Sequence, residues 1–220
     1  MIEPDWPAPA GVRALVTTRA EGDLGGAALR ARLPAEPRWM KQVHGVRVLE
    51  KKDFSVKNPE GDAAVSSERN SVCVVKIADC MPVLFAADAG TTVGIAHAGW
   101  RGLAGGVLEN TIRAMRVAPQ RLMAWLGPAI GPRVYEVGEE VRQAFAGHEY
   151  AFVPTRPGHW NLDLYAVARQ RLLDAGLRNL FGGSFCTYTD RGQFFSWRRE
   201  RDAQRMAAAI WLTDVESPAP

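Results

Sequence analysis

Residues 72–102 read VCVVKIADCMPVLFAADAGTTVGIAHAGWRG and contain three apolar runs, at 72–77, 83–87 and 92–96. Runs of this length that are rich in β-branched and other apolar residues predict buried strands. The connections between them are too short for helical crossovers, so these strands do not fit a purely parallel, doubly wound sheet. The stretch therefore predicts an α+β fold in which a mixed β-sheet is layered with helices.

The rest of the chain continues this mixture of short strands and helices. Helical periodicity appears at 103–115, 137–145 and 162–173, and Asn161 is the expected N-cap of the last helix. No linker and no repeat divides the 220 residues, so we expect one domain over residues 1–220 with a loose tail at 216–220. Five further segments have the composition of strands: 12–18, 46–50, 122–126, 180–187 and 206–212.

The bulk composition is that of an ordinary globular protein. Hydrophobic residues make up 47% and charged residues 23%, and 27 basic against 24 acidic residues give a net charge of +3. This bias is too weak to indicate a nucleic-acid surface, although a small anionic substrate is compatible with it. Neither a signal peptide nor a membrane-spanning run is present. We expect a cytoplasmic protein that binds neither nucleic acid nor membrane; its oligomeric state is not fixed by the sequence, and a monomer is compatible with it.

Three potential metal ligands stand beside turns: His44, Cys80 and His97. Zinc binds thiolate and imidazole together, and three protein ligands with an open fourth position are typical of a catalytic zinc site. The spacing of the three matches no compact zinc-finger pattern, so the ligand types carry the prediction. Cys73 lies inside an apolar run and Cys186 at the end of one, so both are expected to pack in the core.

Two other chemistries fit the same residues. Cys80 and His97 could form a nucleophile–base pair without metal, with Asp79 or His44 orienting the pair. Copper also accepts imidazole and thiolate, but four histidines are too few for a conventional multicopper oxidase. From the residues alone, zinc, copper and metal-free catalysis all remain open.

Several cations are candidates for binding an anionic substrate. Arg101 directly precedes the helix expected near residue 102, where unpaired backbone amides favour an anion such as phosphate. Lys41 could supply a second cation. The segment 196–200 places Arg198 and Arg199 beside a tryptophan, a combination that can stack on a base or bind phosphate. An edge strand with solvated charges is the alternative for that segment.

On these motifs the chain resembles the YfiH family, the laccase-domain proteins described both as polyphenol oxidases and as purine nucleoside phosphorylases. The matching motifs follow in the family's order from residue 39 to the C-terminus. The resemblance implies a fold like that of deamidase toxins of the cytotoxic-necrotizing-factor type. The motifs are WMKQVHG at 39–45, ADCMPVLF at 78–85, AHAGWRGL at 96–103, LGPAIGP at 126–132, YEVG at 135–138, CTYT at 186–189 and FFSWRR at 194–199.

The resemblance also implies an activity and a ligand set. His44, Cys80 and His97 would bind zinc, and the substrates would be phosphate and the purine nucleosides adenosine, inosine, guanosine and methylthioadenosine, with free base and pentose 1-phosphate as products. Adenosine deamination would be a second activity, in which a zinc-activated water attacks C6. In phosphorolysis Arg101 and an N-terminal arginine would hold the phosphate. Asp79 would orient a ligand or protonate the departing base.

The chain departs from the family pattern before residue 39. The family's glycine-rich turn, Ser-Leu-Asn-Leu stretch and Asn-Arg pair are shortened here, and Arg30 or Arg32 is the expected counterpart of the phosphate-binding arginine. Ile77 stands where the family usually has threonine. Other classes of function stay open as alternatives: a metal-independent Cys/His amidase or peptidoglycan-precursor editing hydrolase, a copper polyphenol oxidase, and a non-enzymatic nucleotide-binding domain that uses Arg198 and Arg199.

Overall fold

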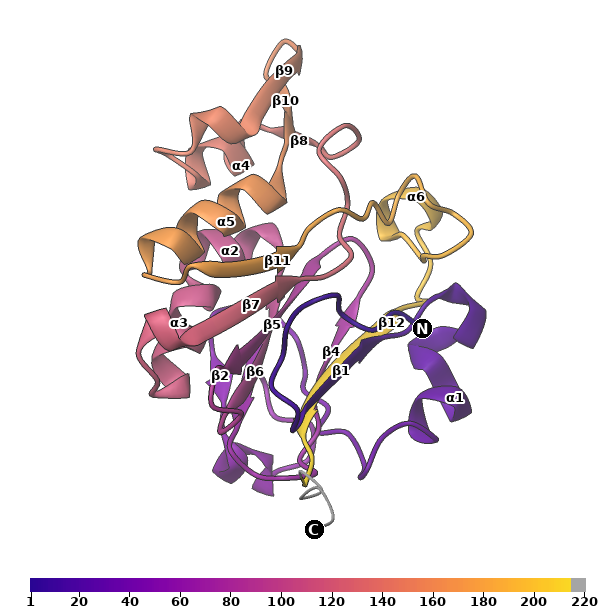
Figure 1. Ribbon diagram of the computed structural model, residues 1–220. Coiled ribbons are helices and arrows are strands. Elements are labelled where there is room, and N and C mark those ends of the chain that lie inside the picture. Colours follow the sequence, from indigo (N-terminus) through magenta and orange to yellow (C-terminus); the bar gives the residue numbers. More distant parts are fainter. Residues whose placement is uncertain (215–220) are drawn as a thin grey trace.

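The three apolar runs all form strands, and these are divided between two sheets. The computed structural model describes residues 1–214. β5 (Met81–Ala87) and β6 (Val93–Ala98) are antiparallel neighbours at the centre of a six-stranded sheet, whereas β4 (Cys73–Ile77) lies at the edge of a three-stranded sheet. β5 is apolar throughout because both of its faces are buried. Figure 1 shows both sheets with helices around them.

The six-stranded sheet is mixed, which confirms the α+β prediction. Its order is β11-β7-β5-β6-β3-β2, and the two outer pairs, β11 with β7 and β2 with β3, are parallel while the inner pairs are antiparallel. The strands not yet given bounds are β2 (Val48–Leu49), β3 (Ala63–Ser66), β7 (Leu122–Leu126) and β11 (Asn179–Gly182).

Three helices cover one face of this sheet: α2 (Trp100–Gly105), α3 (Val107–Met115) and α5 (Leu164–Asp174). Their apolar side chains share a core with alternate residues of β5. A single helix was expected over 103–115, but Gly106 has φ 97° and separates α2 from α3. A left-handed residue of this kind ends a helix, so the chain changes direction there.

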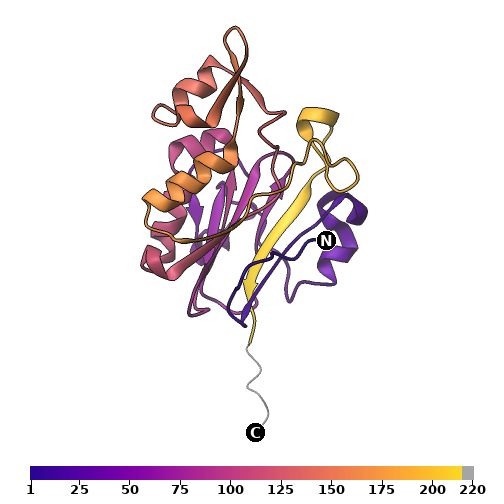
Figure 2. The same cartoon turned by 45° about the horizontal axis from the view of Figure 1, so that its top comes forward.

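The second sheet packs on the opposite face of the first. It consists of β1 (Val12–Val16), β12 (Met206–Leu212) and β4, all antiparallel. A second core fills the space between the two sheets, and a third lies between the small sheet and α1 (Gly26–Arg30). The molecule therefore has four layers, helices, large sheet, small sheet and α1, which can be followed in Figures 1 and 2.

The remaining elements lie at the end of the molecule that is uppermost in Figure 1 or serve as short connections. A third sheet has the order β8-β10-β9 and carries α4 beside it. No helix in the described part of the chain is long and apolar enough to cross a membrane. The bounds are β8 (Glu136–Gly138), α4 (Glu139–Ala144), β9 (Phe152–Arg156), β10 (His159–Leu162) and α6 (Trp197–Glu200), with 3-10 turns at Arg19–Glu21, Asp23–Gly25, Lys51–Ser55, Pro119–Arg121 and Glu149–Ala151.

Two expected boundaries are wrong for physical reasons. Asn161 does not cap α5, because it pairs within β10; Asp163 is the cap, and its side chain accepts a hydrogen bond from the Ala166 N–H at 2.9 Å. The strand expected over 180–187 ends at Gly182, because Gly182 and its successor have φ of 69° and 81° and turn the chain away. The tail expected at 216–220 lies outside the described residues.

Candidate metal centre

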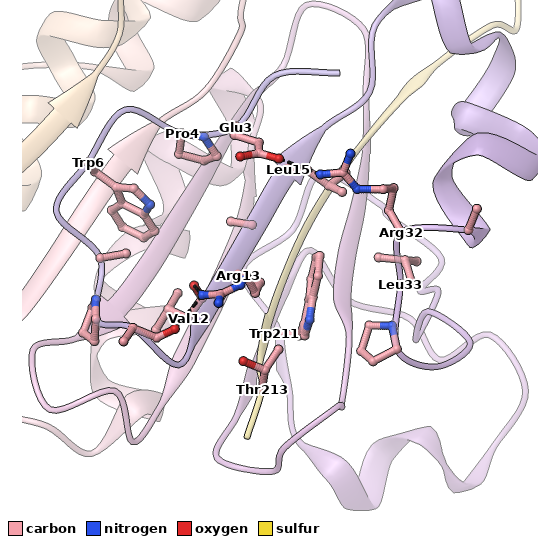
Figure 3. Close-up of a pocket in the computed structure, with 16 residues that line it drawn as sticks. Glu3, Pro4, Trp6, Val12, Arg13, Leu15, Arg32, Leu33, Trp211 and Thr213 are labelled. Atoms are coloured by element: carbon pink, nitrogen blue, oxygen red, sulfur yellow. Dashed lines mark hydrogen bonds and ion pairs between the residues drawn. The ribbon is translucent and has the colours of Figure 1, made fainter. Parts of the chain in front are cut away.

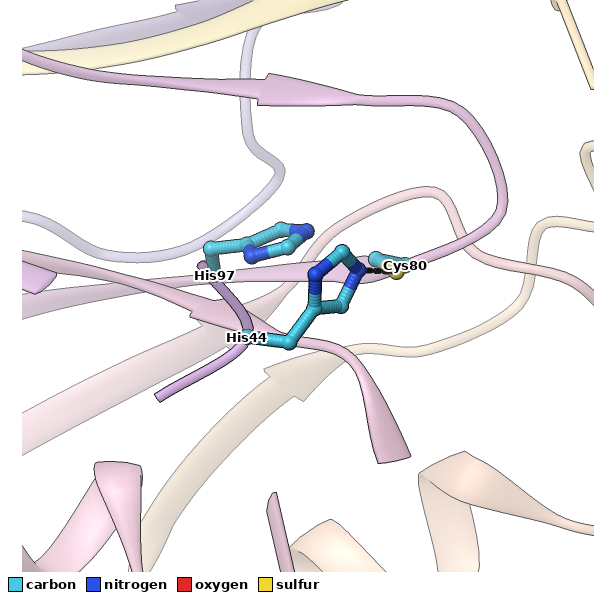
Figure 4. Close-up of side chains that lie close together, drawn as sticks. All are labelled: His44, Cys80 and His97. Carbon is cyan, nitrogen blue, oxygen red and sulfur yellow. Dashed lines mark hydrogen bonds between the residues drawn. The ribbon is translucent and has the colours of Figure 1, made fainter. Parts of the chain in front are cut away.

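His44, Cys80 and His97 meet at one point, with their ligand atoms all within 4.8 Å of one another (Figure 4). Cys80 directly precedes β5, and His97 lies near the end of β6. Because the register of these strands pairs Pro82 with His97, both ligands lie at the same end of the sheet. The Cys80 Sγ is 3.7 Å from the His44 Nε2. The structure thus brings together the three residues that sequence reasoning selected as ligands.

Asp62 holds two of the three ligands in place. Its carboxylate is fully buried; Oδ1 lies 2.9 Å from the His97 Nδ1 and accepts the His44 N–H at 2.9 Å. Oδ2 accepts the N–H groups of Val43 at 3.0 Å and Gly45 at 2.8 Å. With Nδ1 engaged, His97 presents Nε2 to the centre. Sequence reasoning missed Asp62, because one acidic residue before an apolar run is too common a signal.

Two glycines of the HAGWRG motif are required by close approach. A Cβ on Gly99 would lie 2.9 Å from both the Cys80 Sγ and the His44 Cδ2, and a Cβ on Gly102 would lie 2.9 Å from the Gly45 carbonyl oxygen. Contacts this short do not occur for real side chains. A larger residue at either position would therefore displace the loop at 43–45 that carries His44 (the ligand loop). The motif therefore leaves space around the three donors.

The electrostatics of the group favour a thiolate. Burial raises the pKa of Cys80, but the positive charge of His97 and hydrogen bonds to both histidines outweigh it and lower the pKa to about 6. Burial lowers the pKa of His97, but the Cys80 thiolate and the Asp62 carboxylate raise it to about 9. A thiolate is both the metal-binding form of cysteine and its nucleophilic form, so this pair suits either chemistry.

Asp79 directly precedes Cys80 in the chain, but its carboxylate is engaged by other parts of the protein. It is buried with φ 83°; its Oδ1 accepts the Thr187 hydroxyl at 2.6 Å and its Oδ2 accepts the Arg198 N–H at 2.6 Å. Both oxygens are thus engaged by protein donors. These contacts tie the residues around 187 and α6 to the turn that carries Cys80.

The three ligands open into a pocket of about 610 Å³. Two of the expected cations, Lys41 and Arg101, line it, and the Arg101 side chain is 59% exposed. Arg101 lies in the first turn of α2, which begins at Trp100, and not before the helix as expected. The other lining residues are Gln42, His44, Asn58, Lys76, Ala78, Cys80, His97, Trp197 and Arg205.

Three other expected cations lie elsewhere. Arg30 is exposed on α1, and Arg32 forms an ion pair with Glu3 at 2.6 Å in a separate groove on the outer side of the small sheet (Figure 3). The Arg198 guanidinium lies 5.3 Å from the centre of the Tyr135 ring, and its Nη1 donates to the Glu136 carbonyl oxygen at 2.9 Å. None of Arg30, Arg32 and Arg198 is among the residues that line this pocket.

The neighbouring Arg199 is also structural, because its guanidinium donates to the carbonyl oxygens of Thr187 and Phe194 at 2.8 and 2.6 Å. The alternative of an edge strand at 196–200 is wrong as well, since Trp197–Glu200 forms α6. Pocket residues that sequence reasoning missed are Lys76 and Arg205. No motif marks them, because they meet only through the pairing of β4 with β12.

The other two cysteines stand apart from the ligand group. Cys73 is buried, and its burial raises the pKa of the thiol to about 12, as suits a core residue. Cys186 is only half-buried, so its expected place in the core is wrong. It lines a different pocket and accepts the Gly131 N–H at 3.2 Å. Its sequence position at the end of an apolar run gave no sign of this pocket.

Comparisons with known proteins identify the family. A family model described as multi-copper polyphenol oxidoreductase laccase matches residues 26–213. A Xylella fastidiosa protein named purine nucleoside phosphorylase is 44% identical over 247 aligned positions, covering 94% of this chain and 95% of the relative. The Escherichia coli purine nucleoside phosphorylase YfiH is 41% identical over 244 positions, covering 96% and 98%. These alignments are longer than the 220-residue chain, so the relatives contain residues that it lacks.

Solved structures give the same result. A Neisseria meningitidis protein of the DUF152 family superposes with a TM-score of 0.91 at 40% identity, covering 97% of this chain and 99% of that one. YlmD from Geobacillus stearothermophilus superposes with a TM-score of 0.82 at 29% identity, covering 94% of each chain. Sequence motifs, fold and family model agree, and the chain therefore belongs to the laccase-like family that includes the YfiH proteins.

Proposed function

We propose that this chain is a zinc-dependent purine nucleoside phosphorylase that also deaminates adenosine. The observation that carries the proposal is the group of His44, Cys80 and His97 beneath a pocket lined by cations, in a chain whose relatives are named purine nucleoside phosphorylases. Phosphorolysis requires an anion site for phosphate beside a nucleoside site. A cationic pocket above the ligand group suits that requirement.

The donor set fits zinc. One thiolate and two imidazoles are ordinary zinc ligands, and three protein ligands leave one position for water or substrate. Asp62 fixes the ring of His97 through a hydrogen bond to Nδ1, as carboxylates commonly do for zinc-bound histidines. Gly99 leaves the space between Cys80 and His44 clear. When bound, zinc would supply the Lewis acidity that activates water for deamination at C6 of adenosine.

The chain's own residues account for part of the phosphorolysis. Arg101 is the candidate for binding phosphate, since its guanidinium is in the pocket and its nearest carboxylate oxygen, on Glu140, is 3.9 Å away. A phosphate oxygen forms the new bond to C1′ while the bond from C1′ to the purine nitrogen breaks and the base leaves with its electron pair. Trp197 lines the pocket with a half-exposed ring on which a purine can stack.

Laccase chemistry, which the family description names, fits the residues poorly. Within residues 1–214 the structure contains a single group of three potential metal ligands. The remaining histidines, His148 and His159, lie outside it. A multicopper oxidase needs several copper sites with many histidines, so we do not extend that activity to this chain.

A metal-free cysteine amidase is the second candidate, favoured by the thiolate at Cys80 and the raised pKa of His97.

The two candidates differ in their response to chelation. Purified protein is incubated with inosine or adenosine, with and without phosphate, before and after treatment with a chelator, and the products are separated by chromatography. We expect phosphate-dependent release of hypoxanthine and phosphate-independent conversion of adenosine to inosine.

Both reactions should stop on chelation and in Cys80→Ser, whereas the matched Cys186→Ser variant should keep its zinc and its activity. Unchanged amide hydrolysis after chelation, without nucleoside turnover, would support the amidase and overturn the proposal.

A further inference from the structure

Two cations that line the pocket have no role in the phosphate binding proposed for Arg101. Lys76 lies near the end of β4, and Arg205 lies one residue before β12. The register of these antiparallel strands places Ala207 opposite Lys76. Arg205 is two residues from Ala207 and so lies diagonally across the β4–β12 pair from Lys76, and both residues line the pocket.

In the described part of the chain, neither charged group of this pair forms an ion pair with a carboxylate. Within residues 1–214, no carboxylate oxygen lies within 4.0 Å of the Lys76 Nζ or of the Arg205 guanidinium nitrogens, and no acidic residue lines the pocket. The one carboxylate in contact with Arg205 is that of Asp23, whose Oδ1 accepts the Arg205 backbone N–H at 2.8 Å. The other two pocket cations each have an acidic neighbour. The Lys41 Nζ lies 3.4 Å from the Glu60 carboxylate, and the Arg101 Nη2 lies 3.9 Å from the Glu140 carboxylate. Two like charges that line one pocket repel each other, so an anion between them would be stabilising.

Both cations are held in position by their surroundings. The Arg205 guanidinium lies 5.3 Å from the centre of the Trp197 ring, and its Nη1 donates to the carbonyl oxygens of Asp202 and Gln204 at 2.9 and 2.8 Å. The Lys76 Nζ lies 5.5 Å from the centre of the Trp39 ring. Packing against indole rings restricts both side chains, which lowers the entropy lost when they bind a ligand.

The pair is also tied directly to the ligand loop. The Gln42 amide donates to the Lys76 carbonyl oxygen at 2.9 Å and accepts the Lys76 N–H at 2.8 Å. Gln42 is two residues from His44, so the backbone at Lys76 is fixed relative to the metal group. A ligand held by Lys76 and Arg205 would therefore have a defined position with respect to the reacting centre.

We propose that Lys76 and Arg205 form a second anion subsite, which binds a phosphoryl group on the small-sheet side of the pocket, whereas Arg101 is carried by α2. A guanidinium beside an ammonium is suited to phosphate oxygens. The phosphoryl group comes either from free phosphate or from the 5′-phosphate of a purine nucleotide. The inference rests on the proposed function for the purine part of the ligand and extends the substrate class to phosphorylated nucleosides.

The test measures binding and does not depend on turnover. Inorganic phosphate and adenosine 5′-monophosphate are titrated calorimetrically into zinc-loaded protein at fixed ionic strength, using wild type, Lys76→Gln and Arg205→Gln. We expect either substitution to weaken binding of at least one probe by about tenfold, since each removes one charge-assisted contact. The control is Lys52→Gln, which removes the same charge from an exposed position outside the pocket. Zinc content and Tm should match wild type in all variants.

Each outcome has a distinct meaning. Weaker binding of inorganic phosphate places the co-substrate at the subsite, and weaker binding of the monophosphate alone places a nucleotide's own phosphate there. Unchanged binding of both probes, or an equal loss in Lys52→Gln, would overturn the inference even if phosphorolysis is observed. Conversely, binding that depends on Lys76 in a protein without phosphorolysis would refute the proposed function and leave the subsite intact.

Discussion

Asp62→Asn is the substitution that most directly tests how the ligand group is held. The two carboxylate oxygens accept from four nitrogen donors, two at each oxygen, at 2.8–3.0 Å. Asparagine has one acceptor oxygen, so in either orientation its NH₂ group faces two of these donors. Two hydrogen bonds to a buried charge are lost, each contributing about 1.5–3 kcal/mol. We therefore expect unfolding free energy to fall by about 3 kcal/mol or more.

The same substitution should weaken zinc binding. Asp62 fixes the ring of His97 and the backbone of His44, and loss of a group that hydrogen-bonds a metal ligand typically costs about 10- to 100-fold in metal affinity. Urea unfolding of the metal-free protein gives the first quantity, and competition with a chromophoric chelator gives the second. Asp88→Asn is the matched control, because Asp88 is exposed and its ion pair with Arg121 contributes about 1 kcal/mol at most. Wild-type zinc affinity together with a stability loss no larger than the control's would refute this account of Asp62.

Three further predictions concern the pocket, the thiol and the ligand spacing. Arg101→Ala should raise the KM for phosphate by about tenfold while adenosine deamination changes less, as steady-state kinetics would show. The control Arg30→Ala, at an exposed position of α1, should leave both reactions unchanged. In metal-free protein, the rate at which iodoacetamide alkylates Cys80 should rise with pH, with a midpoint near pH 6, because the thiolate reacts and the pKa of Cys80 is lowered to about 6. A midpoint near pH 9 would contradict the claim that the two histidines stabilise the thiolate. Gly99→Ala should reduce zinc affinity in the chelator competition, because its Cβ would lie 2.9 Å from the Cys80 Sγ, whereas Gly138→Ala, with nothing within 4 Å of its Cβ, should not.

The ligand group could be predicted from sequence because its signals are local. His44, Cys80 and His97 each stand beside a turn. For Cys80 and His97, the short connection between antiparallel β5 and β6 brings both residues to the same end of the sheet. The fold class followed from the same short connections. Likewise β7 and β12 have the predicted bounds, since each is a continuous apolar run buried on both faces.

What could not be predicted depends on contacts between distant segments. Asp62 acts through donors in another loop and another strand, and Lys76 meets Arg205 only once β12 returns to pair with β4. Arg198 and Arg199 looked like ligand-binding cations because their partners are backbone carbonyl oxygens, which sequence patterns do not display. Helix and strand bounds failed where pairing or a left-handed glycine overrode local periodicity.

Stoichiometric zinc titration of phosphate-dependent inosine cleavage tests the central claim most directly. Metal-stripped protein is supplied with increasing zinc, and ribose 1-phosphate formation is measured in the presence of phosphate. The account predicts no product without zinc, full activity at one zinc per chain, and no recovery in Cys80→Ser. Full phosphorolysis by the metal-free protein would contradict it.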